Sequence, residues 1–394
     1  MSRPGTDVDV VVIGAGIHGV GMAQAAAAAG HSVLILEQTE PAAGSSSRSS
    51  KLIHGGLRYL ETGQLRLVRE SLHERTTMLR LAPSLVKLQR FYIPIYRATR
   101  RRPWQLNVGL SLYALLCGLS AGAGFGCVPR RLWHTLDGLD TRELEHVYYY
   151  HDAQTDDRAL TGAVLRSGAG LGAQLLCPAE CIGVSLEDAG VTVRFRADGH
   201  EKRCRATVLV NAAGPWADRL ARLVSPAIPV PHLECVQGTH IILKAAAPAH
   251  YYYVESPRDG RAVFVMPWHG QLMVGTTESR FRGDPSTVAP TPAELHYLLG
   301  VLRHYFPQFR AQDAAELSAS FAGLRVLPIG SGHAFHRSRE TLLTLDRPAK
   351  PRVLSIYGGK LTTWRAVSER ALKLIAASLP PRRAVARTDE LPLS

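Results

Sequence analysis

Near the N-terminus, the hydrophobic positions follow the order of a strand, a glycine turn, a helix and a second strand. Residues 8–13 are a short β-branched run, which is typical of a buried parallel strand. This run leads into the glycine-rich segment 14–19, and the Ala-rich stretch up to residue 29 predicts a helix. Residues 33–36 form a second apolar run with Glu37 at its end. The order predicts an α/β unit built on a parallel sheet.

Polar and apolar positions alternate between about residues 232 and 339, with turn residues separating the segments. This pattern indicates an antiparallel sheet and a second domain. Thr291 and Glu294 form a capping box that predicts a helix within this region. The expected strands are residues 239–243, 262–267, 271–275 and 317–324.

These segments predict an α/β chain with an α+β second domain. We expect a discontinuous first domain over residues 1–80, 145–230 and 340–390. A helical insertion is expected over 81–144, and an antiparallel sheet domain over 231–339.

Composition and charge narrow the class of protein. The 394 residues are 46% apolar and 20% charged, which excludes disorder and coiled coil. Lys and Arg exceed Asp and Glu by 46 to 33, a net charge of +13 that should attract anionic partners. Nucleic acid is not expected, because no aromatic-and-basic recognition motif is present. The six cysteines fit a reducing compartment and ordinary packing rather than disulfides or a metal site.

One long stretch raises the question of a membrane contact. Residues 103–129 contain no charged residue, and Arg100, Arg101 and Arg102 lie just before them. The densely apolar part, residues 108–119, is shorter than the ~20 residues that span a bilayer. A buried helix is the leading interpretation, and contact with a membrane surface stays open. No secretory signal is expected at the N-terminus.

The glycine segment and the acidic residue that follows it match a dinucleotide-binding signature. Gly14 permits a tight turn, Gly16 lets the backbone approach a pyrophosphate, and Gly19 allows close packing of helix on strand. Glu37 would accept hydrogen bonds from ribose hydroxyls and repel a 2′-phosphate, which disfavours NADP. This motif alone leaves FAD and NAD open, and two later turns, in residues 208–216 and 357–363, favour FAD.

Several blocks resemble FAD-dependent glycerol-3-phosphate dehydrogenases of the aerobic type. The segment from Ser49 to Glu61 closely resembles their flavin-contacting segment. Further matching blocks follow in the family's order: residues 211–216, 237–240, 264–268, 275–277, 283–285, 323–325 and 358–363. The resemblance implies a Rossmann-like FAD-binding domain of the glutathione-reductase or D-amino-acid-oxidase type, with an inserted antiparallel substrate sheet.

No metal is expected, and the resemblance implies which residues contact FAD. These are Gly14, Gly16, Gly19, Glu37, Ser45, Ser46, Ser49, Ser50, Lys51, His54, Gly214, Gly359, Lys360, Leu361 and Thr362.

The activity implied by the resemblance is oxidation of sn-glycerol 3-phosphate to dihydroxyacetone phosphate, with hydride transfer to N5 of FAD. Arg58, Tyr59, Arg339 and Lys360 match the residues that bind the substrate phosphate. His240 is the expected base, on the expectation that its imidazole has an ordinary pKa near 6.5. Arg325 is expected to hold the substrate oxygen and stabilise the alkoxide.

The family usually passes electrons to a membrane quinone. We therefore expect a cytoplasmic protein with a peripheral contact at the inner face of the cytoplasmic membrane. Many members continue into a C-terminal helical domain, which we expect to be absent because this chain ends at Ser394. Two alternatives remain: a related FAD-dependent oxidase or dehydrogenase of another anionic hydroxy acid or amine, and a flavin-binding protein with impaired catalysis.

Overall fold

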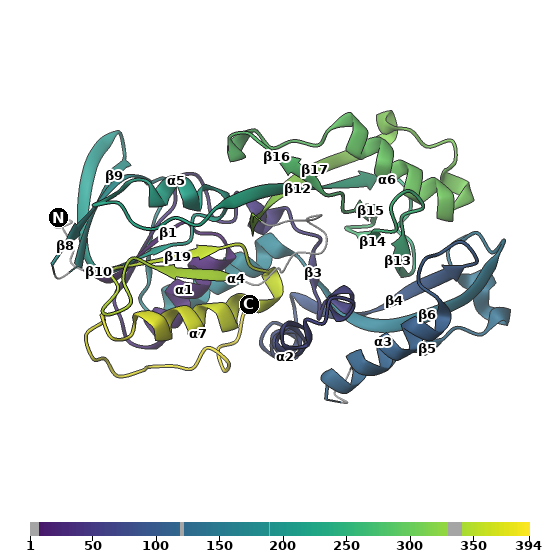
Figure 1. Ribbon diagram of the computed structural model, residues 1–394, viewed down its shortest axis with the longest axis horizontal. Coiled ribbons are helices and arrows are strands. Elements are labelled where there is room, and N and C mark those ends of the chain that lie inside the picture. Colours follow the sequence, from purple (N-terminus) through teal and green to yellow (C-terminus); the bar gives the residue numbers. More distant parts are fainter. Residues whose placement is uncertain (1–7, 119–121, 189, 330–340) are drawn as a thin grey trace.

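The chain is elongated, and each half is built around its own β-sheet (Figure 1). The computed structural model describes residues 8–118, 122–188, 190–329 and 341–394. The first half contains the N-terminal strand and the C-terminal helix, and the second half contains most of the middle of the sequence.

The first sheet has a parallel centre and an antiparallel extension. Its parallel strands run in the order β7-β2-β1-β10-β19, and β18 joins the outer edge of β19 in the antiparallel direction. The first part of β10 forms an antiparallel meander with β9 and β8. The strands are β1 (Val8–Ile13), β2 (Val33–Leu36), β7 (Gln174–Leu176), β8 (Glu180–Glu187), β9 (Gly190–Ala197), β10 (His200–Asn211), β11 (Val224–Ser225), β18 (Leu342–Leu345) and β19 (Val353–Tyr357).

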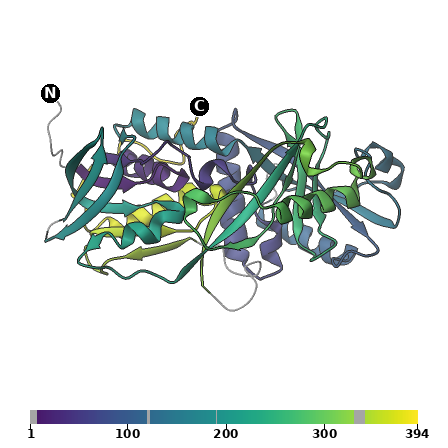
Figure 2. The same cartoon turned by 90° about the horizontal axis from the view of Figure 1, so that it is seen from above.

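Strand β1 is buried on both faces, as its continuous apolar run predicts. Val10 and Val12 face a core shared with the helices, and Val11 and Ile13 face the core under the meander. Helix α1 (Ile17–Ala28) packs between α4 (Asp157–Gly170) and α7 (Trp364–Ile375), and Figure 2 shows these helices beside the sheet. The predicted bounds of β1 and β2 are confirmed.

The second sheet is mostly antiparallel and runs in the order β16-β12-β15-β14-β13-β4-β6-β3, with β17 on β12 and β5 on β6. The one parallel pair along this order joins β13 to β4. The strands are β3 (Leu52–Ile53), β4 (Val86–Tyr96), β5 (Gly126–Cys127), β6 (Leu144–Thr155), β12 (Leu233–Leu243), β13 (Tyr251–Glu255), β14 (Ala262–Trp268), β15 (Gln271–Gly275), β16 (Ser279–Phe281) and β17 (Leu317–Pro328).

The prediction of a helical insertion over residues 81–144 is wrong for its first part. Residues 86–96 form strand β4, which pairs with β6 along its whole length and continues the second sheet. Strand β6 also belongs to this sheet, although residues from 145 onward were expected in the first domain. The physical reason is that β4 is stabilised by partners about fifty residues or more away in sequence, which no local pattern reveals.

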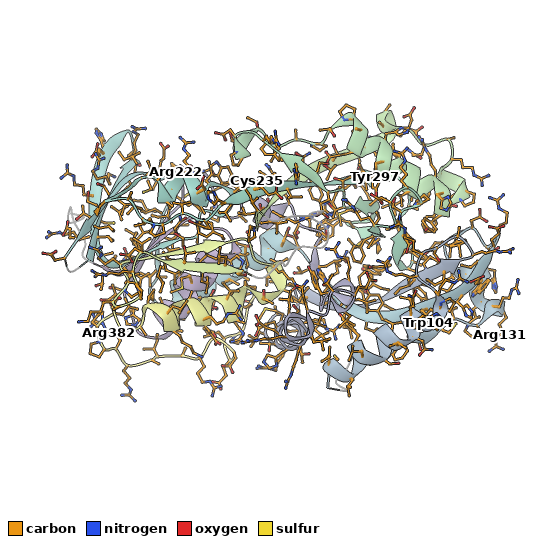
Figure 3. All side chains as sticks on the ribbon, in the orientation of Figure 1. Trp104, Arg131, Arg222, Cys235, Tyr297 and Arg382 are labelled. Carbon is orange, nitrogen blue, oxygen red and sulfur yellow. The ribbon has the colours of Figure 1, made fainter. Side chains whose placement is uncertain are left out.

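Two longer helices accompany the second half and the junction, and a short helix packs on the first sheet. Helix α6 (Pro292–Tyr305) packs on the second sheet and begins at the predicted capping box of Thr291 and Glu294. Helix α2 (Leu65–Leu81) lies where the two halves meet, and the short α5 (Ala217–Ala221) follows β10. In Figure 3, Cys235 near the start of β12 lies between the halves.

Helix α3 (Pro103–Leu116) covers part of the uncharged stretch and is only half buried. Leu106, Leu110 and Tyr113 pack inward. Trp104 and Leu115 on the outer side are 67% and 68% exposed, so the expected buried helix is buried on one face alone. Among the described residues, no helix combines the length and apolar character that a membrane span requires.

Candidate active site

The turn after β1 has the geometry of a dinucleotide cradle. Gly14 has a φ of +101°, and a Cβ at this position would lie 2.7 Å from the carbonyl oxygen of Ala212. A side chain is therefore excluded at the point where the chain turns into α1. The Ile17 N–H, in the first turn of α1, donates to Ser46 Oγ at 2.9 Å. The positive end of the helix dipole thus lies beside a serine-rich loop, an arrangement suited to an anion.

Glu37 fixes this turn from the end of β2. Its Oε2 accepts a hydrogen bond from the Ala15 N–H at 2.8 Å, and its Oε1 accepts one from the Thr39 N–H at 3.0 Å. The side chain lies on the wall of a large cavity that begins here. Glu37 therefore connects the glycine turn to the place where a ribose would lie.

This cavity has a volume of about 940 Å³ and extends from the glycine turn to the second sheet. That volume is near the upper end of ligand pockets and suits a large cofactor together with a small substrate. Thirteen of the residues predicted to contact FAD line it: Gly14, Gly16, Glu37, Ser45, Ser46, Ser49, Ser50, His54, Gly214, Gly359, Lys360, Leu361 and Thr362.

Gly19 and Lys51 do not line the cavity. Gly19 lies behind it, where a Cβ would collide with the carbonyl of Gly14, so its contribution is to packing. Lys51 is 5% exposed, and its Nζ lies 2.7 Å from Asp157 Oδ1 and 2.6 Å from the carbonyl oxygen of Ser47. The ammonium group is thus held in a buried ion pair behind the cavity wall, 5.0 Å from the centroid of the Phe321 ring.

A row of cross-strand partners forms the part of the cavity wall that belongs to the second sheet. From β13 to β17 the partners are Tyr253, Phe264, Gly275, His240 and Phe321 in register. Aligned partners put their side chains on the same face of the sheet, and His240 stacks on Phe321 with ring centroids 4.8 Å apart. Tyr253, Phe264 and His240 all line the cavity.

His240 is almost completely buried within this row. Its Nε2 lies 3.0 Å from Ser50 Oγ, and its Nδ1 has no hydrogen-bond partner among the described residues. Burial, together with the charges of Arg325 and Lys51, lowers the pKa of His240 to about 3. The ordinary pKa expected from sequence is therefore wrong, and His240 is neutral at physiological pH.

Arg325 approaches His240 across a glycine. It lies opposite Val236, two residue pairs from Gly238 and four from His240 along β12 and β17. A Cβ on Gly238 would collide with the Arg325 guanidinium, whose Nη2 lies 3.4 Å from the carbonyl oxygen of Thr277. Gly238 thus leaves the space through which the guanidinium reaches the cavity.

The predicted phosphate-binding residues gather around one aromatic ring. Lys360 Nζ lies 3.7 Å from the centroid of the Tyr59 ring, and Arg58 Cζ lies 5.8 Å from it. All three residues line the same cavity as His240 and Arg325. Arg339, the fourth predicted phosphate ligand, lies outside the described residues.

Six charged residues on the cavity wall were not predicted: Arg48, Glu180, Arg219, Arg261, Glu278 and Asp284. Glu278 follows the Gly275-Thr276-Thr277 block, and Arg261 begins the turn into β14. Both stand beside blocks on which the family resemblance rests, so their place in the motif was visible. The direction in which their side chains point could not be predicted from the sequence. No group of three His, Cys, Asp or Glu side chains placed to hold a metal occurs in the part of the chain that is described.

Comparison with known proteins agrees with this geometry. The family model described as FAD dependent oxidoreductase matches residues 9–363. The glycerol-3-phosphate dehydrogenase of Pseudomonas aeruginosa is 37% identical over 92% of this chain and 70% of its own length. The D-erythritol 1-phosphate dehydrogenase of Brucella abortus is 34% identical over 96% of this chain and 76% of its own length.

A solved structure shares the fold. The glycerol-3-phosphate dehydrogenase from Bacillus halodurans, complexed with FAD, superposes with a TM-score of 0.78. The match covers 99% of this chain and 68% of that one at 24% identity. FAD is the cofactor, and the side-chain-free cradle at Gly14, the Glu37 carboxylate and the volume of the cavity fit it. The chain therefore belongs to the FAD-dependent oxidoreductase family and, within it, to the glycerol-3-phosphate dehydrogenase group.

Proposed function

We propose that the protein oxidises sn-glycerol 3-phosphate to dihydroxyacetone phosphate. The observation that carries this proposal is that positive charge lines the cavity at two separate places. Arg58 and Lys360 lie around Tyr59, and Arg325 lies beside His240. Two anionic features of the reaction, the phosphate and the developing alkoxide, need two such groups. The names of the similar dehydrogenases support the same substrate class.

In this proposal the residues around Tyr59 hold the phosphate. Arg58 supplies a planar fork that can donate to two phosphate oxygens, and Lys360 supplies a compact charge. Binding the phosphate at this end fixes the substrate's orientation, which is the main contribution that a protein makes to such a reaction.

Arg325 and His240 act on the secondary hydroxyl. Arg325 donates to the oxygen as negative charge develops on it, and the neutral imidazole of His240 accepts the hydroxyl proton. FAD, when bound, accepts the hydride that leaves the carbon. An anionic substrate beside His240 favours the protonated imidazole and so offsets part of the effect of burial on its pKa.

A longer polyol phosphate is the second candidate substrate. The relative from Brucella abortus is named for D-erythritol 1-phosphate and is nearly as similar as the glycerol-3-phosphate dehydrogenase. Another anionic hydroxy acid or amine, or a flavin-binding protein with impaired catalysis, would be consistent with FAD binding alone. The cationic pair at Tyr59 favours an anionic substrate, and the names of the similar dehydrogenases favour a phosphate.

We also propose a quinone-type electron acceptor and a peripheral contact with an anionic membrane. Helix α3 supports this: Trp104, Val108 and Leu115 expose one apolar stripe, and the helix contains no charged residue. Arg131 is exposed at the same end of the molecule as Trp104 (Figure 3).

Co-sedimentation with vesicles that contain anionic lipid tests this contact. The wild type should sediment with the vesicles, and the double variant Trp104→Ser/Leu115→Ser should not. The matched control Val385→Ser, at another exposed apolar residue, should sediment like the wild type. Equal sedimentation of both variants would contradict the contact.

The substrate is tested anaerobically. The purified yellow holoenzyme is mixed with sn-glycerol 3-phosphate or D-erythritol 1-phosphate, and the flavin absorbance is followed. Rapid bleaching by one of them supports a polyol phosphate and identifies which. A flavin that stays oxidised with both would overturn the proposed function.

A further inference from the structure

Glu278 is a buried carboxylate on the wall of the active-site cavity, between two arginines. Its side chain is 4% exposed, and its Oε2 lies 3.7 Å from Nη1 of both Arg325 and Arg261. A buried carboxylate stays ionised only where positive charge or hydrogen bonds compensate the loss of water. The two guanidinium groups supply that compensation, so Glu278 provides a negative charge beside Arg325.

The chain on either side of Glu278 is fixed from behind the sheet. Thr277 Oγ1 and Ser279 Oγ both donate to Glu294 Oε1, at 2.8 Å and 3.0 Å. The Thr239 N–H donates to Thr277 Oγ1 at 2.8 Å, which ties the segment to β12. Glu294 itself belongs to the capping box at the start of α6.

Side chains alternate along this extended segment. Thr277 and Ser279 point to Glu294, whereas Thr276 and Glu278 line the cavity. The segment therefore has little freedom to turn Glu278 away. A carboxylate held in this way is suited to accept a hydrogen bond from a ligand.

A phosphate cannot be the group that Glu278 contacts, because two anions would repel each other. The phosphate is better placed at Tyr59, where Lys360 Nζ lies 3.7 Å from the ring centroid. A carboxylate on the substrate would be repelled by Glu278 in the same way. At the end opposite to its phosphate, a polyol phosphate has a neutral hydroxyl group. A hydroxy acid whose carboxylate lay beside Glu278 would lack that hydroxyl.

We propose that Glu278 selects phosphorylated polyols by accepting a hydrogen bond from the terminal hydroxyl, on the carbon next to the one that is oxidised. This inference rests on the proposed function and adds a specificity-determining residue to it. Arg261 contributes by holding the Glu278 carboxylate in place, while Arg325 acts at the reacting oxygen. The two ends of the substrate would thus meet opposite charges, the phosphate the cations around Tyr59 and the hydroxyl the Glu278 carboxylate.

The test compares two substrates that differ in that hydroxyl. These are sn-glycerol 3-phosphate and propane-1,2-diol 1-phosphate of the same configuration, which keeps the phosphate and the secondary hydroxyl. The rate of anaerobic flavin reduction by the holoenzyme gives kcat/KM for each. We expect the wild type to prefer the hydroxylated substrate by about 10- to 100-fold, the usual effect of one hydrogen bond to a charged group.

Two variants remove the acceptor to different degrees. Glu278→Ala should reduce the preference to within about threefold, and Glu278→Gln, which keeps the shape but not the charge, should give an intermediate preference. Glu234→Gln is the matched control, since Glu234 pairs with Arg280 at 3.5 Å on the neighbouring strands and does not line the cavity. It should keep the wild-type preference.

The outcomes separate the two proposals. If the variants slow both substrates equally and keep the preference, Glu278 only supports Arg325 and the inference is overturned. If the wild type reduces its flavin equally fast with both substrates, the inference fails while the proposed function stands. If neither glycerol nor erythritol phosphate reduces the wild-type flavin, the proposed function fails and the inference fails with it.

Discussion

The Arg325 guanidinium lies over Gly238, in the space that a side chain at residue 238 would enter. A Cβ there would come 3.2 Å from Arg325 Cζ, still closer to Nη2, and 2.7 Å from Thr276 Oγ1. The strand pair β12–β17 places both residues on the same face of the sheet, two residues apart along it. The position of the cation therefore depends on the absence of a side chain at its neighbour.

Gly238→Ala should disable the site while preserving the fold. The methyl group must displace the guanidinium, and a misplacement of about 1 Å in an active site can cost about 10²-fold in rate. We expect kcat/KM with glycerol 3-phosphate to fall by about 10²-fold and flavin content to stay unchanged.

The matched control is Gly300→Ala in α6, where an added Cβ meets no atom within 4 Å. It should leave activity unchanged and slightly stabilise the helix. Wild-type kcat/KM in Gly238→Ala would show that the position of Arg325 does not matter.

The pH dependence of kcat/KM should lack a contribution from His240 near pH 6.5. This rate constant reports the ionisable groups of the free enzyme and of the free substrate. In the free enzyme the pKa of His240 is lowered to about 3 by burial and by Arg325 and Lys51. A base with a lowered pKa stays unprotonated as pH falls, so His240 should remain competent from pH 8 down to about 5. An ordinary histidine would lose activity tenfold for each unit below its pKa.

The measurement is kcat/KM between pH 5 and 8 for the wild type and His240→Gln. If kcat/KM of the wild type decreases near pH 6.5, the same decrease should occur in His240→Gln, although kcat/KM of the variant is lower at every pH. A decrease that disappears with His240 would mean that the histidine titrates normally.

Local signals determined which parts of the molecule could be predicted. The bounds of β1 and β2 follow from short apolar runs beside glycines, and the start of α6 follows from the reciprocal bonds of Thr291 and Glu294. Strand β4 could not be predicted, because its residues are extended only through pairing with β6 and β13.

Within the site, too, features set by local sequence could be predicted, and features set by distant partners could not. The glycines of the turn after β1 are recognisable from their spacing, whereas the serines on the cavity wall were implied by the family resemblance. Lys51 lies within a matching block but has a φ of +60°, pairs with Asp157 and does not line the cavity. Glu278 lies just after a matching block and points inward, because Thr277 and Ser279 are bound to Glu294. Such directions depend on partners far away in the sequence.

The buried pair of Arg75 and Asp152 should contribute strongly to stability. Arg75 Nη1 lies 2.7 Å from Asp152 Oδ1, and neither side chain is more than 3% exposed. Asp152 also accepts hydrogen bonds from Tyr113 Oη and, at 3.2 Å, from the Gly55 N–H beneath the loop that carries Arg58. Asp152→Ala leaves a buried guanidinium without its carboxylate, so we expect the holoenzyme to lose about 3–5 kcal/mol of unfolding free energy.

Urea denaturation with saturating FAD measures this loss. Arg194→Ala breaks a surface pair with Glu201, whose side chains are 43% and 45% exposed, and should cost less than about 1 kcal/mol. Equal losses in the two variants would mean that burial of the Asp152 pair adds nothing.

Glu37 should determine how tightly FAD is held. Its carboxylate lies on the cavity wall and already accepts hydrogen bonds from the Ala15 and Thr39 N–H groups. Glu37→Ala removes both the anchor of the glycine turn and the acceptor for ribose hydroxyls. Since one hydrogen bond to a charged group contributes about 1.5–3 kcal/mol, we expect the Kd for FAD to rise by roughly 10- to 100-fold.

Fluorescence titration of FAD into the flavin-depleted protein gives the Kd. Glu40→Ala is the control, because Glu40 lies close to Glu37 in sequence but is 58% exposed and pairs only at the surface, with Arg158. Its Kd should match the wild type. If Glu37→Ala also binds FAD as the wild type does, the carboxylate holds neither the turn nor the ribose, and the phosphate cradle at α1 alone must account for the affinity.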